Sequence, residues 1–454
     1  MIQAISHHTQ LMIRTETNKI IFEGDLKSEI MPAISRIYHL SQKLGYQDIV
    51  LDFSGATYAD ATLMLPLSSF AAFHRKHHID FSLVEPADGY LRRLFKNANW
   101  AHFIDPTSYD LNEKRRFNNL PALQFTDGDA QHAVVNKAME VLMETIKVQE
   151  RKQLKALEWA LNEITDNVLN HAESPTGGMV QIQSFPTNNT VTFYVADTGL
   201  GIAATLRRAI PSITSDTDAL DRAIREGVTR NQATNQGNGL FGTFKCCEVS
   251  NGRVEIISNH AHLSWPEKTG LSIRQENVPF GGSFIAATIN YSTAGLLEKA
   301  FVFRGRVHEP ANDYIEAHYE TQGEKLIFRV AQEIEGFGSR EFGRRARQKI
   351  DNILVEKDIV IEFDFSDIPL ISSSFADEVF GKLFVQLGAL EFMRRCTFRA
   401  VDPTVKTLID RAIALRMKSN LNAGACFAAD VRDGSFSTQS GRLAMSVIRP
   451  NLPW

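Results

Sequence analysis

Three polar side chains recur at four-residue intervals in the segment LNEITDNVLNHAES, residues 161–174: Glu163, Asn167 and His171. Residues four apart lie on one face of an α-helix, so a helix here aligns a carboxylate, an amide and an imidazole. Apolar residues at helical spacing predict a buried stripe on a neighbouring face. The stripe consists of Leu154, Leu157, Ala160, Leu161, Ile164 and Val168.

A carboxylate and an amide one helical turn apart suit Mg²⁺ that keeps several water ligands. The amide oxygen of Asn167 would ligate the metal, and Glu163 would orient or deprotonate a nucleophile. A solvated helix face carries the same residue types, so this pattern by itself leaves both interpretations open.

A second motif follows a predicted apolar strand in VTFYVADTGLGI, residues 191–202. Asp197 stands at the strand end, where a carboxylate can accept a hydrogen bond from the exocyclic amine of a base. Gly199 and Gly201 allow the backbone to turn and to approach a flat ring without a Cβ. A simple Asp-Thr-Gly turn is the competing interpretation.

A third motif is a glycine cluster in TNQGNGLFGTFKCCEV, residues 234–249. Gly237, Gly239 and Gly242 precede a predicted helix at 243–249, and glycine amides leading into a helix N-terminus form a phosphate cradle. The cluster departs from both the P-loop and the dinucleotide-binding glycine patterns. A plain flexible loop remains the alternative for this motif alone.

Taken together and in order, these motifs resemble those of the Bergerat-fold ATPases, the histidine-kinase-like or GHKL group, and are closest to its anti-sigma-factor serine kinases. The family pattern E-x-x-x-N, D-x-G-x-G, glycine loop and closing G-T/S strand has counterparts over residues 150–290. The last of them is GGSFIAATI, residues 281–289, with Ser283. The resemblance implies a central α/β sandwich that binds ATP and Mg²⁺.

By this resemblance Glu163 is the general base or water-positioning group, Asn167 the Mg²⁺ ligand and Asp197 the adenine anchor. Ser283 supports the contact of Asp197 through its hydroxyl, and residues 203–236 form the ATP lid. Further implied binding residues line the base or close over the phosphates: Gly199, Gly201, Gly237, Gly239, Leu240 and Gly242. Lys245 and Arg230 are candidate phosphate ligands, and we expect His171 to pack at the pocket wall.

Strands and helices alternate on both sides of this central region, which predicts layered α/β modules. We predict four segments: an α/β domain at 1–115, the ATP-binding domain at 116–296, a second α/β domain at 297–430 and a C-terminal tail at 431–454. Residues 113–129 are polar and rich in turn formers and predict a linker. The stretch after Asn420 predicts a disordered end or a last hairpin.

The outer modules share a pattern that indicates an internal duplication. DIVLDFSGATYADAT from Asp48 and IEFDFSDIPLISSS from Ile361 each contain D-F-S, and a hydroxyl residue follows each Asp after ten positions: Thr62 and Ser374. Helix N-caps in unrelated strand–helix units produce similar patterns. Both modules resemble the STAS domains of anti-sigma-factor antagonists, in which a Ser or Thr at a helix start accepts phosphate.

Thr62 and Ser374 are therefore candidate phosphoacceptors. The match is incomplete: Asp60 fits the STAS motif, but Leu63 stands where Gly is usual, and Ser372 takes the Asp position in the second copy. A binding scaffold whose hydroxyls cap helices is the alternative.

The composition limits the remaining classes. A formal net charge of −4 gives no overall attraction for nucleic acid or anionic lipid, and no apolar run reaches membrane-spanning length. Four cysteines without C-x-x-C spacing argue against a zinc site and fit a cytoplasmic protein. The basic run at 340–349 predicts a solvated helix face.

Two functions are compatible with these motifs. One is an ATPase or serine/threonine kinase that acts on a regulatory protein partner in a partner-switch system. The other is a non-catalytic, nucleotide-gated protein-interaction module, and a homodimer is compatible with both. A sensor histidine kinase is disfavoured because His132 lacks the usual signature. A DNA-associated ATPase is disfavoured because a transducer domain is missing.

Overall fold

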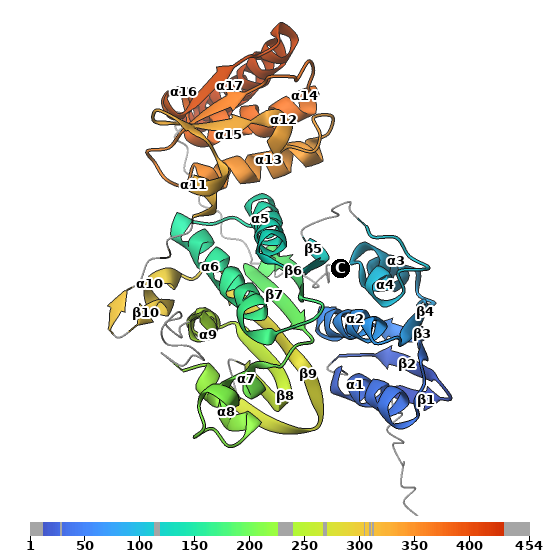
Figure 1. Cartoon of the computed structure of the whole chain (residues 1–454). Helices are drawn as coiled ribbons and strands as arrows, with labels where there is room; N and C mark the ends of the chain where they lie inside the picture. Colours follow the sequence, from blue (N-terminus) through green and yellow to red (C-terminus); the bar gives the residue numbers. More distant parts are fainter. Residues whose placement is uncertain are drawn as a thin grey trace, which may run out of the picture. The chain divides into compact units, whose positions relative to one another are not determined.

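The computed structural model describes residues 12–27, 30–112, 119–225, 239–266, 270–303, 305–307, 310 and 313–430. The chain forms two compact units, residues 1–328 with 345–362, and residues 329–344 with 363–454. Three larger sheets and the helices around them make a mixed α/β protein (Figure 1).

The first sheet has four strands in the order β1-β2-β3-β4. β1 and β2 form an antiparallel hairpin, whereas β3 is parallel to both β2 and β4. The strands are β1 (Ile13–Glu16), β2 (Lys19–Asp25), β3 (Asp48–Tyr58) and β4 (Asp80–Val84). The helices are α1 (Ile30–Tyr38), continued by the π-turn η1 (His39–Lys43), α2 (Ala61–Lys76), α3 (Gly89–Asn97) and α4 (Trp100–Ile104).

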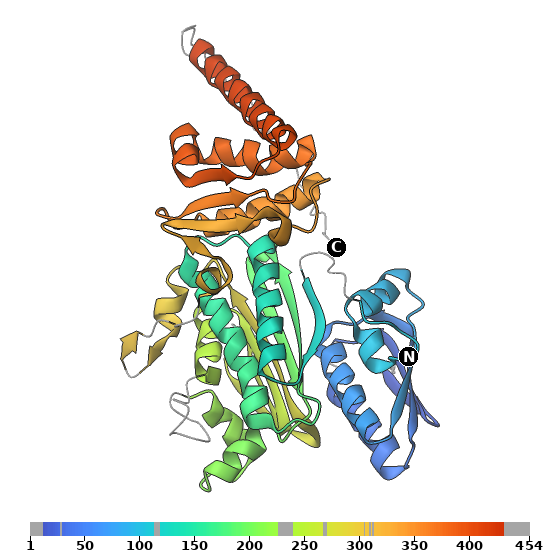
Figure 2. The same cartoon turned by 45° about the horizontal axis from the view of Figure 1, so that its top comes forward.

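The central sheet has five strands in the order β5-β6-β7-β9-β8, and every neighbouring pair is antiparallel. The strands are β5 (Asn119–Phe125), β6 (Gly178–Phe185), β7 (Thr190–Asp197), β8 (Arg253–Pro266) and β9 (Ser272–Asn290), with the 3₁₀ turn η3 (Pro186–Asn188). One face is covered by α5 (Gly128–Thr145), α6 (Arg151–Asn167) and α9 (Gly239–Val249) (Figures 1 and 2).

The opposite face of this sheet shares a hydrophobic core with the N-terminal elements. Met179, Tyr194 and Ala196 belong to that core, and the rings of Phe70 on α2 and Phe280 on β9 lie 5.0 Å apart, edge to face. Alternate residues of β6 and β7 therefore face different layers, as the two-residue period of a strand requires.

Two short helices, α7 (Ile202–Ala209) and α8 (Asp216–Ala223), follow β7 and pack around a small core of their own. They occupy the first part of the predicted ATP lid, and residues 226–236 of that segment lie outside the described residues. Leu240, at the start of α9, packs against this small core. The lid helices and the glycine-rich segment thus meet through apolar contact.

The third sheet repeats the four-strand order of the first, as β12-β13-β14-β15, and also begins with an antiparallel hairpin. Its strands are β12 (Thr321–Gln322), β13 (Lys325–Arg329), β14 (Val360–Asp364) and β15 (Cys396–Arg399). The helices of this region are α11 (Tyr314–His318), α12 (Val330–Glu333), α13 (Arg340–Ile353), α14 (Ser373–Ala376), the π-turn η4 (Asp377–Gly381), α15 (Lys382–Leu387), α16 (Ala389–Arg395) and α17 (Pro403–Asp430). Along the chain, α10 (Leu296–Ala300) and the hairpin of β10 (Val302–Phe303) and β11 (Arg306–Val307) follow β9 and precede α11.

Three expectations about local structure are wrong in whole or in part. The predicted linker 113–129 contains β5, in which Leu120, Ala122 and Phe125 are buried, and a register shift between Leu120 and Leu123 accommodates Pro121. From Asn420 to Asp430 the chain continues as α17 and is neither a disordered end nor a hairpin, whereas the rest of the predicted tail, residues 431–454, lies outside the described residues.

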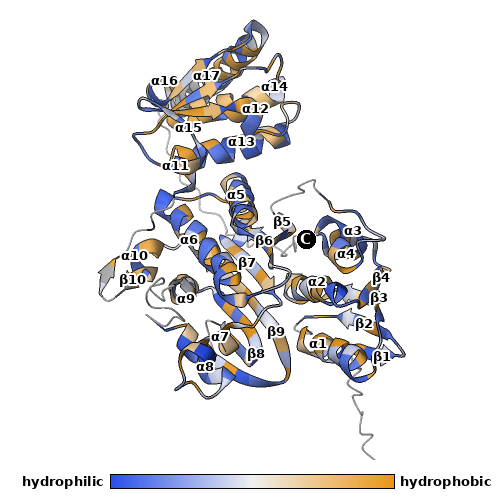
Figure 3. Ribbon diagram, in the orientation of Figure 1, coloured by the Kyte–Doolittle hydropathy of each residue, from blue (hydrophilic) through white to orange (hydrophobic). Residues whose placement is uncertain are grey.

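The third concerns the basic run on α13, which Figure 3 colours mostly hydrophilic. Arg340 and Arg344 are solvated as predicted, with side chains 55% and 60% exposed. Lys349 in the same run is instead fully buried, and its ammonium group lies 3.6 Å from carboxylate oxygens of both Glu140 and Glu144 on α5. A buried lysine needs such partners because an isolated charge is costly to desolvate.

Candidate functional site

Glu163 lies on α6 with its carboxylate against the first residue of α9. A Cβ placed on Gly239 would come within 2.2 Å of Glu163 Oε2, so only glycine allows this approach. Burial, and second the nearby charge of Asp166, raise the pKa of Glu163 to about 7. Among the described residues its carboxylate has no hydrogen-bond partner. A half-buried acid in this state suits proton transfer near neutral pH.

Asn167 is the last residue of α6, one turn beyond Glu163, and it is half-buried. Its side-chain amide likewise has no hydrogen-bond partner within the part of the chain that is described. The π-turn η2 (Val168–Ala172) follows at once, and such turns widen a helix and occur frequently at functional sites. The helix thus ends with two polar side chains, Glu163 and Asn167, one turn apart.

Asp197 ends β7 and is 3% exposed. Burial raises the pKa of its carboxyl to about 7, while the N–H groups of Gly199 and Ser283 oppose that rise. The Gly199 N–H donates to Asp197 Oδ1 over 2.8 Å. The carboxyl group is therefore fixed in orientation at the end of the strand.

The glycine turn after Asp197 is joined to the end of η2. The Leu200 N–H donates to the Ala172 carbonyl over 2.6 Å, and a Cβ on Gly199 would come within 2.0 Å of the same oxygen. Gly201 has φ +84°, a conformation that favours glycine. This contact brings the loop after Asp197 to the end of the helical segment that carries Asn167.

Ser283 pairs with Asp197 in the β7–β9 register, but its hydroxyl takes part in another interaction. Ser283 Oγ accepts the Ile202 N–H over 3.2 Å and lies 3.2 Å from Ser258 Oγ. The hydroxyl therefore supports the start of α7. The contribution of Ser283 to the carboxyl group of Asp197 comes from its backbone N–H.

Two further residues, Ser258 and Asn259, lie beside the glycine turn and were not predicted. Ser258 Oγ accepts the Ile202 N–H over 2.8 Å, and the Asn259 amide contacts the backbone on both sides of Gly201. The only signal in the sequence is that this polar pair directly follows the apolar residues Ile256 and Ile257 on β8.

The glycine-rich segment is described in part. Gly239, Leu240 and Gly242 lie in α9, whereas Gly237 and the candidate phosphate ligand Arg230 lie outside the described residues. Lys245, the other candidate, forms an ion pair with Glu248, and its ammonium group lies 5.8 Å from the centre of the Phe241 ring. These two contacts give Lys245 a local structural role.

Thr62 and Ser374 occupy equivalent positions in their modules. Each is the second residue of its helix, half-buried, and its hydroxyl contacts the N-cap side chain. Thr62 Oγ1 donates to Asp60, and Ser374 Oγ lies 3.0 Å from Ser372 Oγ. Both hydroxyls thus support the side chain that caps the helix, and their role as phosphoacceptors stays a prediction.

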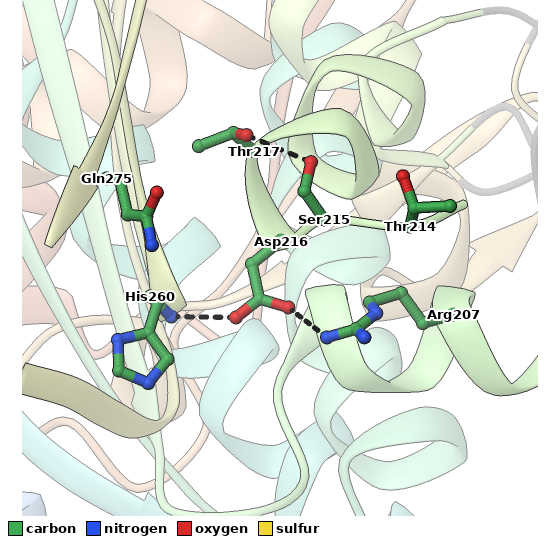
Figure 4. A pocket seen from close by; sticks show the side chains of 7 residues that line it. All are labelled: Arg207, Thr214, Ser215, Asp216, Thr217, His260 and Gln275. Carbon is green, nitrogen blue, oxygen red and sulfur yellow. Dashed lines mark hydrogen bonds and ion pairs between the residues drawn. The ribbon is translucent and has the colours of Figure 1, made fainter.

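A polar hollow of about 290 Å³ lies beside α7 and α8 (Figure 4). In this hollow the Asp216 carboxylate accepts two hydrogen bonds, one from Arg207 Nη1 over 2.9 Å and one from the backbone N–H of His260 over 3.1 Å. The lining consists of Arg207, Thr214, Ser215, Asp216, Thr217, His260 and Gln275. Five of the seven lie in the predicted ATP lid at 203–236, but none is among the residues predicted to contact the nucleotide or the metal.

The structure therefore brings Glu163 against Gly239, and the glycine turn after Asp197 against the end of η2. No group of three or more His, Cys, Asp or Glu side chains gathers as metal ligands in the described ranges. A Mg²⁺ ion here would be held by Asn167 together with oxygens of water and of a bound phosphate, which the hard ion prefers.

Comparison with known proteins identifies one region. A family model described as a STAS-like domain of unknown function (DUF4325) matches residues 343–406, so a STAS-like domain lies toward the C-terminus. No curated protein matches the chain. No helix within the described residues is both long and apolar enough to cross a membrane.

Proposed function

We propose that the central region binds ATP with Mg²⁺ and transfers the γ-phosphoryl group to water or to a Ser or Thr of a partner protein. The flanking modules would place this reaction in a partner-switch signalling system of the anti-sigma type. The proposal is supported by the order of the three motifs and by the contacts that join them. The STAS-like domain found at residues 343–406 is of the class expected beside such an ATPase.

One observation carries the proposal. The carboxylate of Glu163 is half-buried, has no hydrogen-bond partner among the described residues, and lies against the start of the helix that follows the glycine cluster. Burial raises the pKa of this carboxyl group to about 7, and carboxyl groups with strongly raised pKa values occur preferentially at functional sites. The place where the phosphates would bind is next to this group.

Each residue then has a separate task. Glu163 accepts the proton of the attacking hydroxyl, and its pKa of about 7 suits that role at neutral pH. Asn167 offers an amide oxygen to Mg²⁺, an ion that neutralises charge on the phosphates. Asp197 accepts a hydrogen bond from the amino group of adenine, and the glycine turn leaves space for the ring.

Two substitutions separate binding from chemistry. For Glu163→Gln we expect unchanged ADP affinity and a loss of phosphate release of about 100-fold or more, because general-base catalysis contributes that much. For Asn167→Ala we expect weaker binding in the presence of Mg²⁺ and little change when EDTA is present. Isothermal titration with ADP and a phosphate-release assay measure both. An Asn167→Ala protein with unchanged Mg²⁺-dependent affinity would contradict the proposed site.

The acceptor is identified by incubating the chain with γ-labelled ATP and mapping the modified residues. Label on Thr62 or Ser374 indicates a kinase that acts within or between copies of this chain, and Thr62→Val or Ser374→Ala would remove it. Phosphate release without label indicates an ATPase. Nucleotide binding with neither result would favour the nucleotide-gated interaction module.

A further inference from the structure

Asn259 lies on β8 where the pairing of β8 with β9 is irregular. The register shifts on both sides of this residue, and its φ of +52° is left-handed. Asparagine is one of the few residues other than glycine that tolerates this conformation. Bulges of this kind are frequent next to active sites, where they redirect a side chain.

The side-chain amide of Asn259 bridges the two ends of the glycine turn. Its Nδ2 donates to the carbonyl of Leu200 over 3.0 Å, and its Oδ1 accepts the N–H of Ala204 over 3.0 Å. Gly201 lies between these two residues, and a Cβ there would come within 2.5 Å of Asn259 Oδ1. The turn and the amide are therefore in close contact.

The same contacts complete the N-terminus of α7, whose first N–H groups have no partner within the helix. Gly201, at the N-cap, provides no side chain. The N–H of Ile202 is accepted by Ser258 Oγ over 2.8 Å, and that of Ala204 by Asn259. The start of α7 is thus anchored on β8 by side chains.

We infer that Asn259 is a positioning residue of the nucleotide site: it holds the Gly199–Gly201 turn in the shape that receives the flat face of the base. This inference rests on the proposed function. The task requires an amide, because one group must donate to Leu200 and accept from Ala204. A carboxylate cannot donate to a carbonyl oxygen, and a methyl group does neither.

The test compares Asn259→Asp and Asn259→Ala in the full chain. We expect ADP affinity to fall about tenfold in both, since a polar group at the turn loses its partner. We expect phosphate release at saturating ATP to stay near that of the unchanged protein, because Glu163 lies on a different helix. KM for ATP therefore rises while kcat is retained, a separation that general loss of structure does not produce.

Asn251 provides a matched control. It has φ +53°, it is exposed, and it precedes β8 at a turn remote in sequence from the glycine turn. Asn251→Asp and Asn251→Ala repeat the same chemical changes in the same backbone conformation, so they measure the cost of left-handed strain alone. We expect both to bind ADP normally.

The outcomes separate this inference from the proposed function. Absence of ADP binding by the unchanged chain would contradict the proposed function itself. If Asn259→Asp binds ADP as tightly as the unchanged chain, the inference is overturned and the proposed function still stands. A fall in kcat without a change in KM leads to the same conclusion. If circular dichroism shows that Asn259→Ala is unfolded, Ser258→Ala takes its place. That change removes the neighbouring anchor of the turn, and we expect it to raise KM for ATP in the same way.

Discussion

The carboxylate of Glu163 and the backbone of Gly239 are in contact across the interface of α6 and α9, with no space for a Cβ between them. The two residues are 76 positions apart, and each belongs to a different predicted motif. Their contact places a group able to accept a proton at the start of the helix that would receive the phosphates. The position of the carboxylate is therefore sensitive to a single methyl group on α9.

Replacement of Gly239 by alanine tests this contact. The new Cβ meets the far end of a flexible side chain, so Glu163 can move aside and the free energy of unfolding changes little. Displacement of the reacting group by about 1 Å lowers turnover by about 100-fold. We expect phosphate release to fall by this order while ADP affinity changes much less.

Gly128→Ala is the control for the Gly239 variant. Gly128 is also the first residue of a helix, α5, and no atom lies within 4 Å of a Cβ placed there. The Gly128→Ala variant should keep phosphate release and thermal stability near those of the unchanged protein. Equal rates for Gly239→Ala and Gly128→Ala would show that the contact with Glu163 has no catalytic importance.

The pH dependence of phosphate release reports on Glu163. A general base acts when deprotonated, and the pKa of Glu163 is about 7 because of burial and, second, because of the charge of Asp166. The rate should therefore rise with pH through about 7 and then level. Asp166→Asn removes the neighbouring charge and should shift the rising limb to lower pH. An identical midpoint in the two proteins would exclude this influence of Asp166.

The sequence predicted the secondary structure around the candidate site residues better than the contacts that support them. The spacing of Glu163 and Asn167 placed both on α6, and the strand before Asp197 is β7. These features are local, so periodicity and turn residues reveal them. The contribution of Asn259 was not predictable, because it depends on a bulge in β8 and on pairing with a loop 59 residues earlier in the chain.

The repeated D-F-S step illustrates a pattern that local chemistry does determine. In each copy the aspartate accepts the N–H of the serine two residues later, Ser54 to Asp52 over 2.9 Å and Ser366 to Asp364 over 3.0 Å. The shared turn and strand order support the duplication. β5 was missed because Pro121 and the polar residues around it are typical of a loop, whereas burial on the sheet decides their conformation.

Asp197 should make the stability of the nucleotide-free protein depend on pH. Burial raises the pKa of its carboxyl from 3.8 to about 7, so between these values the folded protein binds a proton that the unfolded chain releases. The contribution of Asp197 to the free energy of unfolding therefore decreases as pH rises from about 4 to 7 and is constant above that.

Asp197→Asn removes this titration and keeps an acceptor oxygen for the Gly199 N–H. Compared with the unchanged protein, the variant should be similarly stable at pH 4 and more stable at pH 8, as measured by urea unfolding at both values. ADP binding should be lost, because an amide nitrogen replaces a carboxylate oxygen. Parallel stability profiles for the two proteins would show that Asp197 ionises normally in the folded state.

The N-terminal half of α6 is joined to the segment that leads toward the third sheet. Arg151 Nε lies 2.8 Å from Asp313 Oδ2, and the side chains are 10% and 3% exposed. Asp313 Oδ2 also lies 3.2 Å from Lys155 Nζ, and the Asp313 side chain caps α11. Asp313→Ala leaves two cations without their buried partner, so we expect the free energy of unfolding to fall by about 3–5 kcal/mol.

Glu316→Ala is the matched control for Asp313, since both acids pair with Arg151. Glu316 lies 3.2 Å from Arg151 Nη2, but its side chain is 72% exposed. Solvent screens such a pair, and we expect a loss of at most about 1 kcal/mol. Denaturant unfolding of both variants, with ADP affinity measured in parallel, shows whether damage at the start of α6 reaches Glu163 and Asn167 at its other end. Losses of equal size in Asp313→Ala and Glu316→Ala would mean that burial does not strengthen this link.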